Sequence, residues 1–278
     1  MSVLSKKIGI DPGTSTLRAY VKGEDVFNEP SHAADRAVTA EMLQHLIGKV
    51  QGRIRMFRPE VMISVPAGAP SPARRAVTEA AMSAGARQVW LIDKPLAAAI
   101  GAGLPIHESR GVAVCDIGGA TTEVAVISLS GMVVARSIAV GGKRFDEAIA
   151  AHLQMDVTAA ERLKVAIGAA LPLDEPLREG EITSNDIAAA VAEPLQLIVA
   201  AIRDLLAEAP TRLAADVADR GIVLTGGGAQ LRGLDRYIAM HAGIPCALAE
   251  NPQNSVVRGT GLALENFEVL KRNQAYLR

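Results

Sequence analysis

The stretch VCDIGGATTEVAVIS, residues 114–128, joins an apolar run to an acid, two glycines and two threonines before a second apolar run begins. A similar stretch, IGIDPGTSTLRAYV, occupies residues 8–21. Glycines let the backbone turn tightly and bring N–H groups close to an anion, hydroxyls add hydrogen-bond donors, and a carboxylate can bind a metal ion through water. Each stretch is therefore a candidate phosphate-binding turn.

One such turn is weak evidence, because glycine-rich hairpin corners have the same composition without any ligand. A third glycine-rich loop, LTGGGA at residues 224–229, follows another apolar run. The three loops together favour a ligand. Two facing turns would hold a polyphosphate and its Mg²⁺ between two lobes, and the third loop, opening a helix expected over 231–242, would line the nucleoside.

Apolar runs of strand length alternate with segments of helical spacing along the chain. This alternation predicts an α/β protein whose sheets are covered by helices on their faces. The helical pattern over 184–207 contains Pro194, so we expect a bend or a break there. The chain has 278 residues, which is enough for two lobes with buried cores.

The composition limits the classes of partner. With 3% aromatic residues and a net charge of −1, the chain lacks the basic field and the stacking side chains of a nucleic-acid binder. It has neither a run of eighteen apolar residues nor a secretory signal at its start, so we expect a cytoplasmic protein. Cys115 and Cys246 lie in apolar neighbourhoods and are expected to be small buried hydrophobes.

Seven segments resemble, in chain order, the MreB branch of the superfamily of actins, sugar kinases and seventy-kilodalton heat-shock chaperones. They are GIDPGTSTLRAYVKG, NEPS, RPEVMISVPAG, RRAVTEAAMSAGARQVWLID, PLAAAIGAGLP, DIGGATTEVAVISLSG and DRGIVLTGGGAQLRGLDRYI. The resemblance implies a two-lobed actin-like fold, with a ribonuclease-H-like layer in each lobe and an adenine-nucleotide cleft between the lobes. It places domain I at residues 1–111 plus 252–278 and domain II at residues 112–251.

The same resemblance assigns the site residues. Asp11 and Asp116 would organise Mg²⁺ and water. The β- and γ-phosphates of ATP or ADP would be held by Gly13, Thr14, Ser15, Gly118, Gly119, Ala120 and Thr121. Glu161 and Lys164 would contact the ribose and the base, and the adenosine would be lined by Gly226, Gly227, Gly228 and Ala229. For Glu161 and Lys164 the alternative is a solvated helical face.

The chain departs from the family at the residue expected to position the attacking water. The family carries a glutamate immediately before the proline of the PLAAAIGAG segment, whereas this chain has Lys94. A lysine does not polarise water as a carboxylate does, and it is expected to pair with a phosphate, Asp11 or Asp116. Asp93 is one residue out of register. No catalytic residue is therefore assigned, and at most slow ATP hydrolysis is expected.

A second departure is a basic loop, in which Lys143 and Arg144 stand where the family carries acids. These side chains either attract phosphate or point to solvent. A third departure is length, because the family continues after residues 29–31 as a small subdomain, IB, that is missing here. The segments 149–161 and 172–182 are also short, so the corresponding subdomain of the second lobe, IIB, is expected to be reduced.

The segment RIRMFRPE, residues 53–60, matches a membrane-binding loop of the family. Ile54, Met56 and Phe57 would enter the interface of an anionic membrane at its inner face, and the arginines between them would be attracted to its charge. A filament would multiply such weak contacts. The alternative is that Phe57 packs under the adjoining strand and the arginines form a solvated turn.

The resemblance implies a cytoskeletal or scaffold protein that binds ATP or ADP, self-associates into filaments and hydrolyses ATP slowly or not at all. The alternative is a nucleotide-binding regulatory or chaperone-like protein that does not polymerise, similar to the ethanolamine-utilisation protein EutJ. A sugar or acetate kinase is disfavoured, because Lys94 replaces the acid and no further substrate lobe remains.

Overall fold

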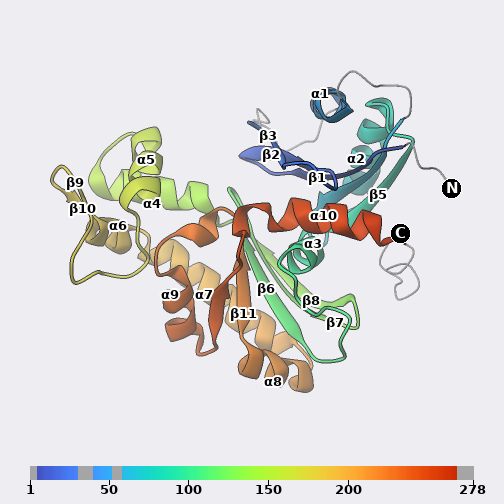
Figure 1. The fold of residues 1–278 in the computed structure, drawn as a ribbon. Helices are drawn as coiled ribbons and strands as arrows, with labels where there is room; N and C mark the ends of the chain where they lie inside the picture. Colours follow the sequence, from blue (N-terminus) through green and yellow to red (C-terminus); the bar gives the residue numbers. More distant parts are fainter. Residues whose placement is uncertain (1–4, 31–39, 52–57, 268–278) are drawn as a thin grey trace. The chain divides into compact units, whose positions relative to one another are not determined.

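The computed structural model describes residues 5–30, 40–51 and 58–267 (Figure 1). The chain divides into two compact units. Unit 1 contains the described residues up to Ser109, the turn Ile127–Met132 and the residues from Gln253 onward. Unit 2 contains Arg110–Val126 and Val133–Pro252.

Unit 1 is built on a five-stranded sheet. Its strands, in the order β3-β2-β1-β4-β5 across the sheet, are Phe27–Pro30, Thr16–Tyr20, Lys7–Pro12, Glu60–Val65 and Gln88–Asp93. The first three strands form an antiparallel meander, and β4 and β5 continue the sheet parallel to β1. Alternation places Ile8 and Ile10 on one face of β1 and Gly9 on the other.

Helices cover both faces of this sheet. Figure 1 shows α1 (Ala40–Gln51) and α2 (Ser71–Ser83) on one side, and α3 (Lys94–Gly101) and α10 (Ser255–Glu265) on the other. Leu43 and Leu46 of α1 are fully buried in the same apolar cluster as the buried residues of β1 and β4 on this face of the sheet. On the opposite face the backbones meet directly, because a side chain on Gly9 would overlap the backbone of Gly261 in α10.

Unit 2 repeats this strand order. Its sheet, β12-β11-β6-β7-β8, consists of Cys246–Leu248, Ile222–Thr225, Val112–Ile117, Thr122–Ser128 and Gly131–Ile138. Strand β11 is parallel to β6 and to β12. In each sheet three consecutive strands are followed by two parallel strands on the other side of the first, so β6 corresponds to β1 and β11 corresponds to β4. The repetition explains why the acid turn occurs twice.

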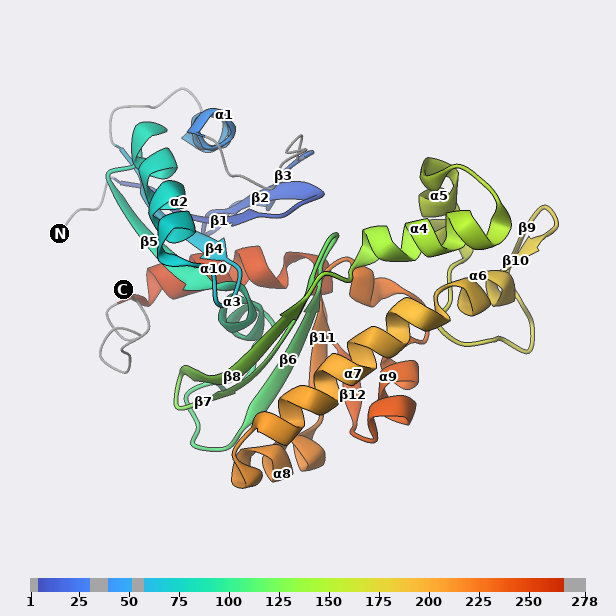
Figure 2. The same cartoon turned by 180° about the vertical axis from the view of Figure 1, so that it is seen from behind.

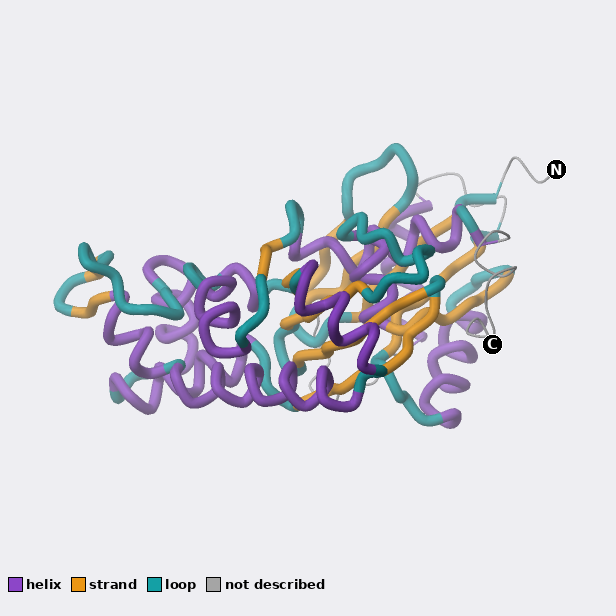
Figure 3. Tube along the Cα trace, turned by 90° about the horizontal axis from the view of Figure 1, so that it is seen from below, coloured by secondary structure: helices purple, strands orange, loops and turns teal. Residues whose placement is uncertain are grey.

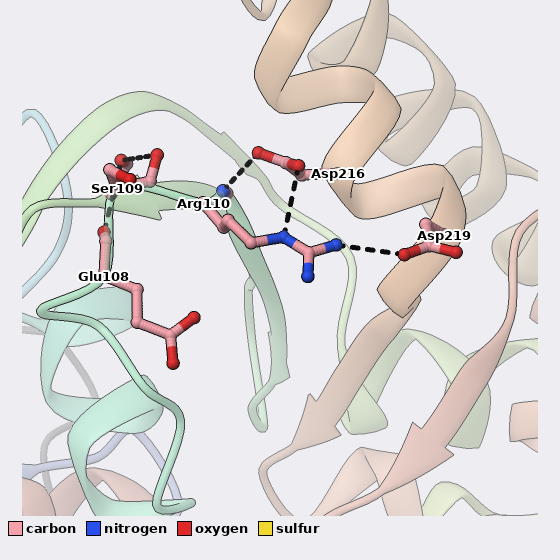
Figure 4. Close-up of polar contacts among 7 residues, drawn as sticks. Glu108, Ser109, Arg110, Asp216 and Asp219 are labelled. Atoms are coloured by element: carbon pink, nitrogen blue, oxygen red, sulfur yellow. Dashed lines mark hydrogen bonds and ion pairs between the residues drawn. The ribbon is translucent and has the colours of Figure 1, made fainter.

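Three helices pack on the unit 2 sheet: α7 (Ala192–Glu208), α8 (Thr211–Arg220) and α9 (Leu234–Ala242). Figure 2 shows α7 lying across the face formed by β6 and β11. Helix α8 is tied to the start of β6, because Asp216 accepts the Gly111 amide at 2.8 Å and Arg110 lies 3.0 Å from Asp219 (Figure 4). The Gly111 hydrogen bond lowers the pKa of Asp216 most strongly, and the charge of the neighbouring Arg110 lowers it further.

A mainly helical subdomain connects β8 to α7 (Figure 3). It consists of α4 (Gly142–Leu153), α5 (Val157–Ile167), α6 (Ser184–Ala190) and a hairpin of two-residue strands, β9 (Arg178–Glu179) and β10 (Ile182–Thr183). The break expected near Pro194 is present, since α6 ends at Ala190 and α7 begins at Ala192, with the proline in the first turn, where a missing N–H is tolerated.

Both cysteines are free thiols. Cys115 is buried as expected, whereas Cys246 is partly exposed. Burial still raises the pKa of Cys246 to about 12, so its reactive thiolate is scarce at neutral pH.

Candidate functional site

The first acid turn lies between β1 and β2. Its carboxylate belongs to Asp11, near the end of β1, and is 5% exposed. The amide of Gly13 donates to the carbonyl oxygen of Asp11 at 3.0 Å and closes the turn. Gly13 and Thr14 are partly exposed and Ser15 is exposed. The turn residues assigned to phosphate are therefore accessible, while the acid behind them is shielded.

The carboxylate of Asp11 has two partners from other elements of unit 1. The hydroxyl of Ser64 in β4 donates to Asp11 Oδ1 at 2.7 Å. The ammonium of Lys94, the first residue of α3, lies 3.1 Å from the same oxygen. The Lys94 side chain is 16% exposed, so this ion pair is largely shielded from water. The sequence predicted that Lys94 pairs with a phosphate, Asp11 or Asp116. The structure shows the ion pair with Asp11.

Asp93 does not take the place of the missing glutamate. It forms an ion pair with Arg74 of α2. Burial raises the pKa of Asp93, and the charge and hydrogen bond of Arg74 oppose that rise. The Asp93 carboxylate therefore pairs with α2 and is not part of the ion pair between Asp11 and Lys94.

The second acid turn joins β6 to β7. Asp116 is 7% exposed, and the Gly118 amide donates to the Thr121 carbonyl oxygen at 2.9 Å across the turn. Thr225 of β11 stands beside Asp116 in register, and its hydroxyl donates to Asp116 Oδ1 at 3.0 Å. Asp116 thus receives a hydroxyl from the neighbouring parallel strand, as Asp11 does from Ser64.

The start of α4 closes against this second turn. The amides of Gly142 and Lys143 donate to the carbonyl oxygens of Gly118 and Gly119 at 2.9 and 2.8 Å. A Cβ on Gly141 would lie 2.6 Å from the Gly118 oxygen, so only glycine permits this approach. The side chains of Lys143 and Arg144 are exposed, and Arg144 lies 3.5 Å from Glu147, which matches the solvent-facing alternative.

The third glycine loop meets the second turn beside Asp116. Gly226 has a φ of 86°, and a Cβ there would lie 2.9 Å from Asp116 Oδ1. A Cβ on Gly228 would lie 2.5 Å from the side chain of Ile117. Gly227 is exposed, whereas Ala229 is buried in the core. Within unit 2 the structure therefore brings two of the three predicted loops together.

The helix expected over 231–242 needs correction. The third loop leads into a short 3₁₀ helix, Gly228–Gln230, and α9 begins only at Leu234. Gly233, with a φ of 72°, precedes α9. This left-handed residue turns the chain between the two helices, so the N-terminus of α9 does not open directly from the glycine loop.

Glu161 and Lys164, assigned to ribose and base, lie on α5. Glu161 is exposed. The ammonium of Lys164 lies 2.6 Å from the buried Asp146 and donates to the Gly142 carbonyl oxygen at 3.1 Å. Burial raises the pKa of Asp146 and Lys164 opposes that rise. Lys164 therefore joins α5 to the start of α4, while Glu161, three residues earlier on the same helix, is exposed.

Ser64 and Thr225 are polar partners that the sequence reasoning missed. A signal was present, because each is a hydroxyl residue within or at the end of an apolar strand, VMISV or IVLT. Recognising them requires knowing that β4 and β11 each run beside an acid-bearing strand.

Ile54, Met56 and Phe57 of the predicted membrane loop lie outside the described residues. Within the described ranges, no helix combines the length and apolar character needed to span a bilayer. In the same part of the chain, no three His, Cys, Asp or Glu side chains gather as a metal site would require.

The family model for MreB/Mbl protein matches residues 33–272 of this chain. The chain belongs to the MreB/Mbl family. It is 41% identical to the cell shape-determining protein MreB of Escherichia coli strain K12, over 96% of this chain and 95% of the relative. That alignment has 332 positions against 278 residues here, so at least 54 positions of the relative have no counterpart in this chain.

Solved structures confirm the predicted actin-like α/β fold. Spiroplasma citri MreB5 bound to AMPPNP matches with a TM-score of 0.86 and 27% identity, covering 97% of this chain and 98% of MreB5. The same protein bound to ADP matches equally well, with a TM-score of 0.86. A double helical filament of MamK matches with a TM-score of 0.79 over 94% of this chain, and at 17% identity it supports the fold alone.

Proposed function

We propose that this MreB-family chain binds ATP or ADP and assembles with further copies of itself into a cytoskeletal scaffold. The observation that carries nucleotide binding is the meeting of the second turn and the third glycine loop beside Asp116. Two glycine-rich segments and a shielded carboxylate at one point are suited to a phosphate chain and its counter-charge. The likeness to MreB5, solved with AMPPNP and with ADP, supports the choice of nucleotide.

Calorimetry with ADP and with AMPPNP tests this site. We expect heat of binding for the wild type and affinity at least ~10-fold weaker for Asp116→Asn, which keeps the oxygen that accepts from Thr225 but removes the charge. Asp219→Asn is the matched control, because that carboxylate lies on the surface of the same unit, 75% exposed. Unchanged binding by Asp116→Asn would contradict the assignment.

Slow or absent hydrolysis belongs to the same proposal. Lys94 stands where the family has its water-positioning glutamate, and its ammonium is paired with Asp11. Catalysis of phosphoryl transfer needs a positioned in-line water, which bound charge alone does not provide. We expect Lys94→Glu to hydrolyse ATP faster than the wild type in a phosphate-release assay. Equal rates would remove Lys94 as the cause of slow turnover.

Self-association is supported by the family, whose E. coli member is named a cell shape-determining protein. The competing proposal is a nucleotide-binding regulator that does not polymerise, and it is supported by the loss of at least 54 alignment positions. Sedimentation and electron microscopy with and without ATP separate the two. Pelleted linear protofilaments support the scaffold, and a monomer at every protein concentration supports the regulator.

The domain assignment is part of this proposal: residues 1–111 with 252–278 as domain I, and residues 112–251 as domain II. The division of the structure after Ser109 and after Pro252 supports it, with the exception of Ile127–Met132, which groups with unit 1. Limited proteolysis followed by mass spectrometry tests it, because linkers between compact units are preferred cleavage sites. Cleavage concentrated within one of the two sheets would contradict the assignment.

Attachment to the inner face of the membrane is proposed from the sequence of residues 53–58 alone. Co-sedimentation with anionic liposomes should fall for the double variant Met56→Ser, Phe57→Ser, because each apolar side chain removed weakens interfacial burial. Neutral liposomes are the control for the charge contribution of the arginines. Undiminished co-sedimentation of the variant would rule the loop out.

A further inference from the structure

The lysine that joins α5 to the start of α4 holds a positive charge against one peptide group of unit 2. The ammonium of Lys164 donates to the carbonyl oxygen of Gly142 at 3.1 Å and lies 2.6 Å from the carboxylate of Asp146. The side chain of Lys164 is 15% exposed and that of Asp146 is 5% exposed. These contacts are therefore shielded from water.

The same peptide group contacts the second turn. A trans peptide carries its C=O and its N–H on opposite sides, and all peptide bonds of the described residues are trans. The C=O of Gly142 accepts from Lys164, and the N–H of this peptide, which belongs to Lys143, donates to the Gly119 carbonyl oxygen at 2.8 Å. The next peptide group joins Gly119 to Ala120, so the Ala120 N–H points away from the Lys143 amide.

Two peptide groups thus lie in series between the ammonium and the Ala120 N–H. Hydrogen-bonded groups in a chain polarise one another, so a cation at one end makes the N–H at the other end a stronger donor. Gly119 and Ala120 are partly exposed. They belong to the turn residues that the family resemblance assigns to phosphate, and a phosphate oxygen is a strong acceptor for a backbone N–H.

We propose that Lys164 is a positioning residue of the nucleotide site, which orients and polarises the Ala120 N–H for a phosphate oxygen through two peptide groups in series and does not contact the ribose or the base. The inference rests on the proposed nucleotide binding. A positive charge beside a helix N-terminus is unfavourable, because the helix dipole is positive there. The carboxylate of Asp146 offsets this cost and keeps the ammonium at the start of α4.

The helix that carries Lys164 is also fixed to the third glycine loop. Arg232 follows the 3₁₀ helix of that loop, and its guanidinium donates to the Gly168 carbonyl oxygen at 3.3 Å, just after the end of α5. The amide of Ala170 donates to the Arg232 carbonyl oxygen at 2.8 Å. Both glycine-rich segments of the proposed site therefore help to set the position of the Lys164 ammonium.

The experiment is calorimetric titration of the full chain with ADP, 2′-deoxy-ADP and IDP. Lys164→Met should weaken binding of all three about 10-fold, and by equal factors within ~3-fold, because the phosphates are common to them. A loss confined to ADP would place the ammonium on the ribose or the base and overturn the inference. Arg162→Met is the matched control, since it removes an exposed cation from the same helix, and it should bind as the wild type does.

Lys164→Met also breaks a buried ion pair, so a second variant separates stability from orientation. Asp146→Asn, Lys164→Met leaves no unpaired buried charge and should recover part of the stability that the single variant loses, as measured by urea denaturation. Its affinity for ADP should stay about 10-fold weaker than that of the wild type, because the ammonium is still missing. Affinity that recovers together with stability would show that Lys164 acts through folding alone.

Nuclear magnetic resonance of the nucleotide-free chain tests the series of peptide groups directly. The amide proton of Ala120 should shift upfield in Asp146→Asn, Lys164→Met, since its N–H is less polarised, and should stay in place in Arg162→Met. An unmoved Ala120 resonance in the double variant would overturn the inference and leave nucleotide binding intact. No binding of ADP by the wild type would instead remove the proposed nucleotide site, and this role of Lys164 with it.

Discussion

The two acid turns occupy equivalent places in two sheets of the same strand order, yet their carboxylates are held differently. Asp11 accepts a hydroxyl from β4 and faces the ammonium of Lys94, whereas Asp116 accepts a hydroxyl from β11. Because β4 and β11 are equivalent strands, the hydroxyl belongs to the repeated scaffold. At Asp11 the ammonium of Lys94, from the same unit, joins this hydroxyl. Comparing the turns therefore separates what the repeated fold provides from what this sequence adds.

The turns also differ in how tightly the backbone around them is packed. A Cβ on Gly226 would meet the carbonyl group of Ile117, and one on Gly141 would meet that of Gly118. At the first turn a Cβ on Gly13 would meet only the Thr16 carbonyl group of its own hairpin. The second turn is thus enclosed by segments distant in sequence, and substitutions there should destabilise the protein most.

Gly226→Ala should have the largest effect. Gly226 has a φ of 86°, and the added methyl group would overlap the Ile117 carbonyl. Backbone strain and overpacking together should lower the free energy of unfolding by about 3–5 kcal/mol. Gly180→Ala is the matched control, because Gly180 has a φ of 63° but no atom within 4 Å of a built Cβ. Urea denaturation followed by circular dichroism should show a loss of about 1 kcal/mol in the free energy of unfolding for Gly180→Ala.

Equal losses for these two variants would mean that backbone strain alone matters and that the close approach of the third loop to β6 does not. The single tryptophan gives an additional check. Trp90 lies in β5 of unit 1, so its fluorescence follows that unit, while circular dichroism follows both.

Lys164→Met should have the next largest effect at neutral pH. It leaves Asp146, which is 4% exposed, without its ammonium partner, and removing one member of a buried ion pair costs about 3 kcal/mol. Lys143→Met, an exposed lysine near the start of α4, is the control and should change the free energy of unfolding by less than about 0.5 kcal/mol.

The loss caused by Lys164→Met should depend on pH. Burial already raises the pKa of Asp146, and removing Lys164 raises it further. A carboxyl whose folded pKa lies above its unfolded value of 3.8 contributes stability below that value and loses it as pH rises through the folded pKa. The difference between variant and wild type should therefore shrink as pH falls toward 4. A pH-independent difference would show that Asp146 does not cause the loss.

The fold, the partner of Lys94 and the break near Pro194 could each be predicted from the sequence. The fold followed from the acid turns and their neighbouring segments, because an acid and glycines after a buried strand are constrained by backbone geometry. Asp11, the partner of Lys94, was among those predicted, because a lysine that replaces an acidic residue in a shielded position is expected to pair with a neighbouring carboxylate. The break near Pro194 followed from a missing N–H group.

Other features could not be predicted, because they depend on which segments meet. Lys164 was assigned to the nucleotide from its position in a motif, but Asp146 lies one helix away and reaches it only after α4 and α5 pack. Ser64 and Thr225 are unremarkable hydroxyls until strand register places them beside Asp11 and Asp116. A one-residue shift in either register would send each hydroxyl to the other face.

Lys94→Met should have a moderate effect on stability. The variant keeps the length of the side chain but removes the ammonium from Asp11, which still accepts the Ser64 hydroxyl. Because that hydrogen bond remains and Lys94 is partly exposed, we expect a loss of about 2 kcal/mol. The measurement is urea denaturation followed by Trp90 fluorescence. Asp11→Asn in the same background should recover part of the loss, and no recovery would show that the pair does not account for it.

The smallest effects should come from the two hydroxyls, and they bear most directly on the comparison. Ser64→Ala and Thr225→Val each remove one hydrogen bond to a shielded carboxylate, worth about 1–2 kcal/mol. If the hydroxyls are equivalent parts of the scaffold, Asp116→Asn should reduce the cost of Thr225→Val, and Asp11→Asn should reduce the cost of Ser64→Ala by a similar amount. Two double-mutant cycles on unfolding free energies measure these couplings. A coupling at Asp116 but none at Asp11 would mean that Lys94, and not the Ser64 hydroxyl, stabilises the Asp11 carboxylate. The two turns would then share the geometry of the hydrogen bond but not its contribution to the free energy of unfolding.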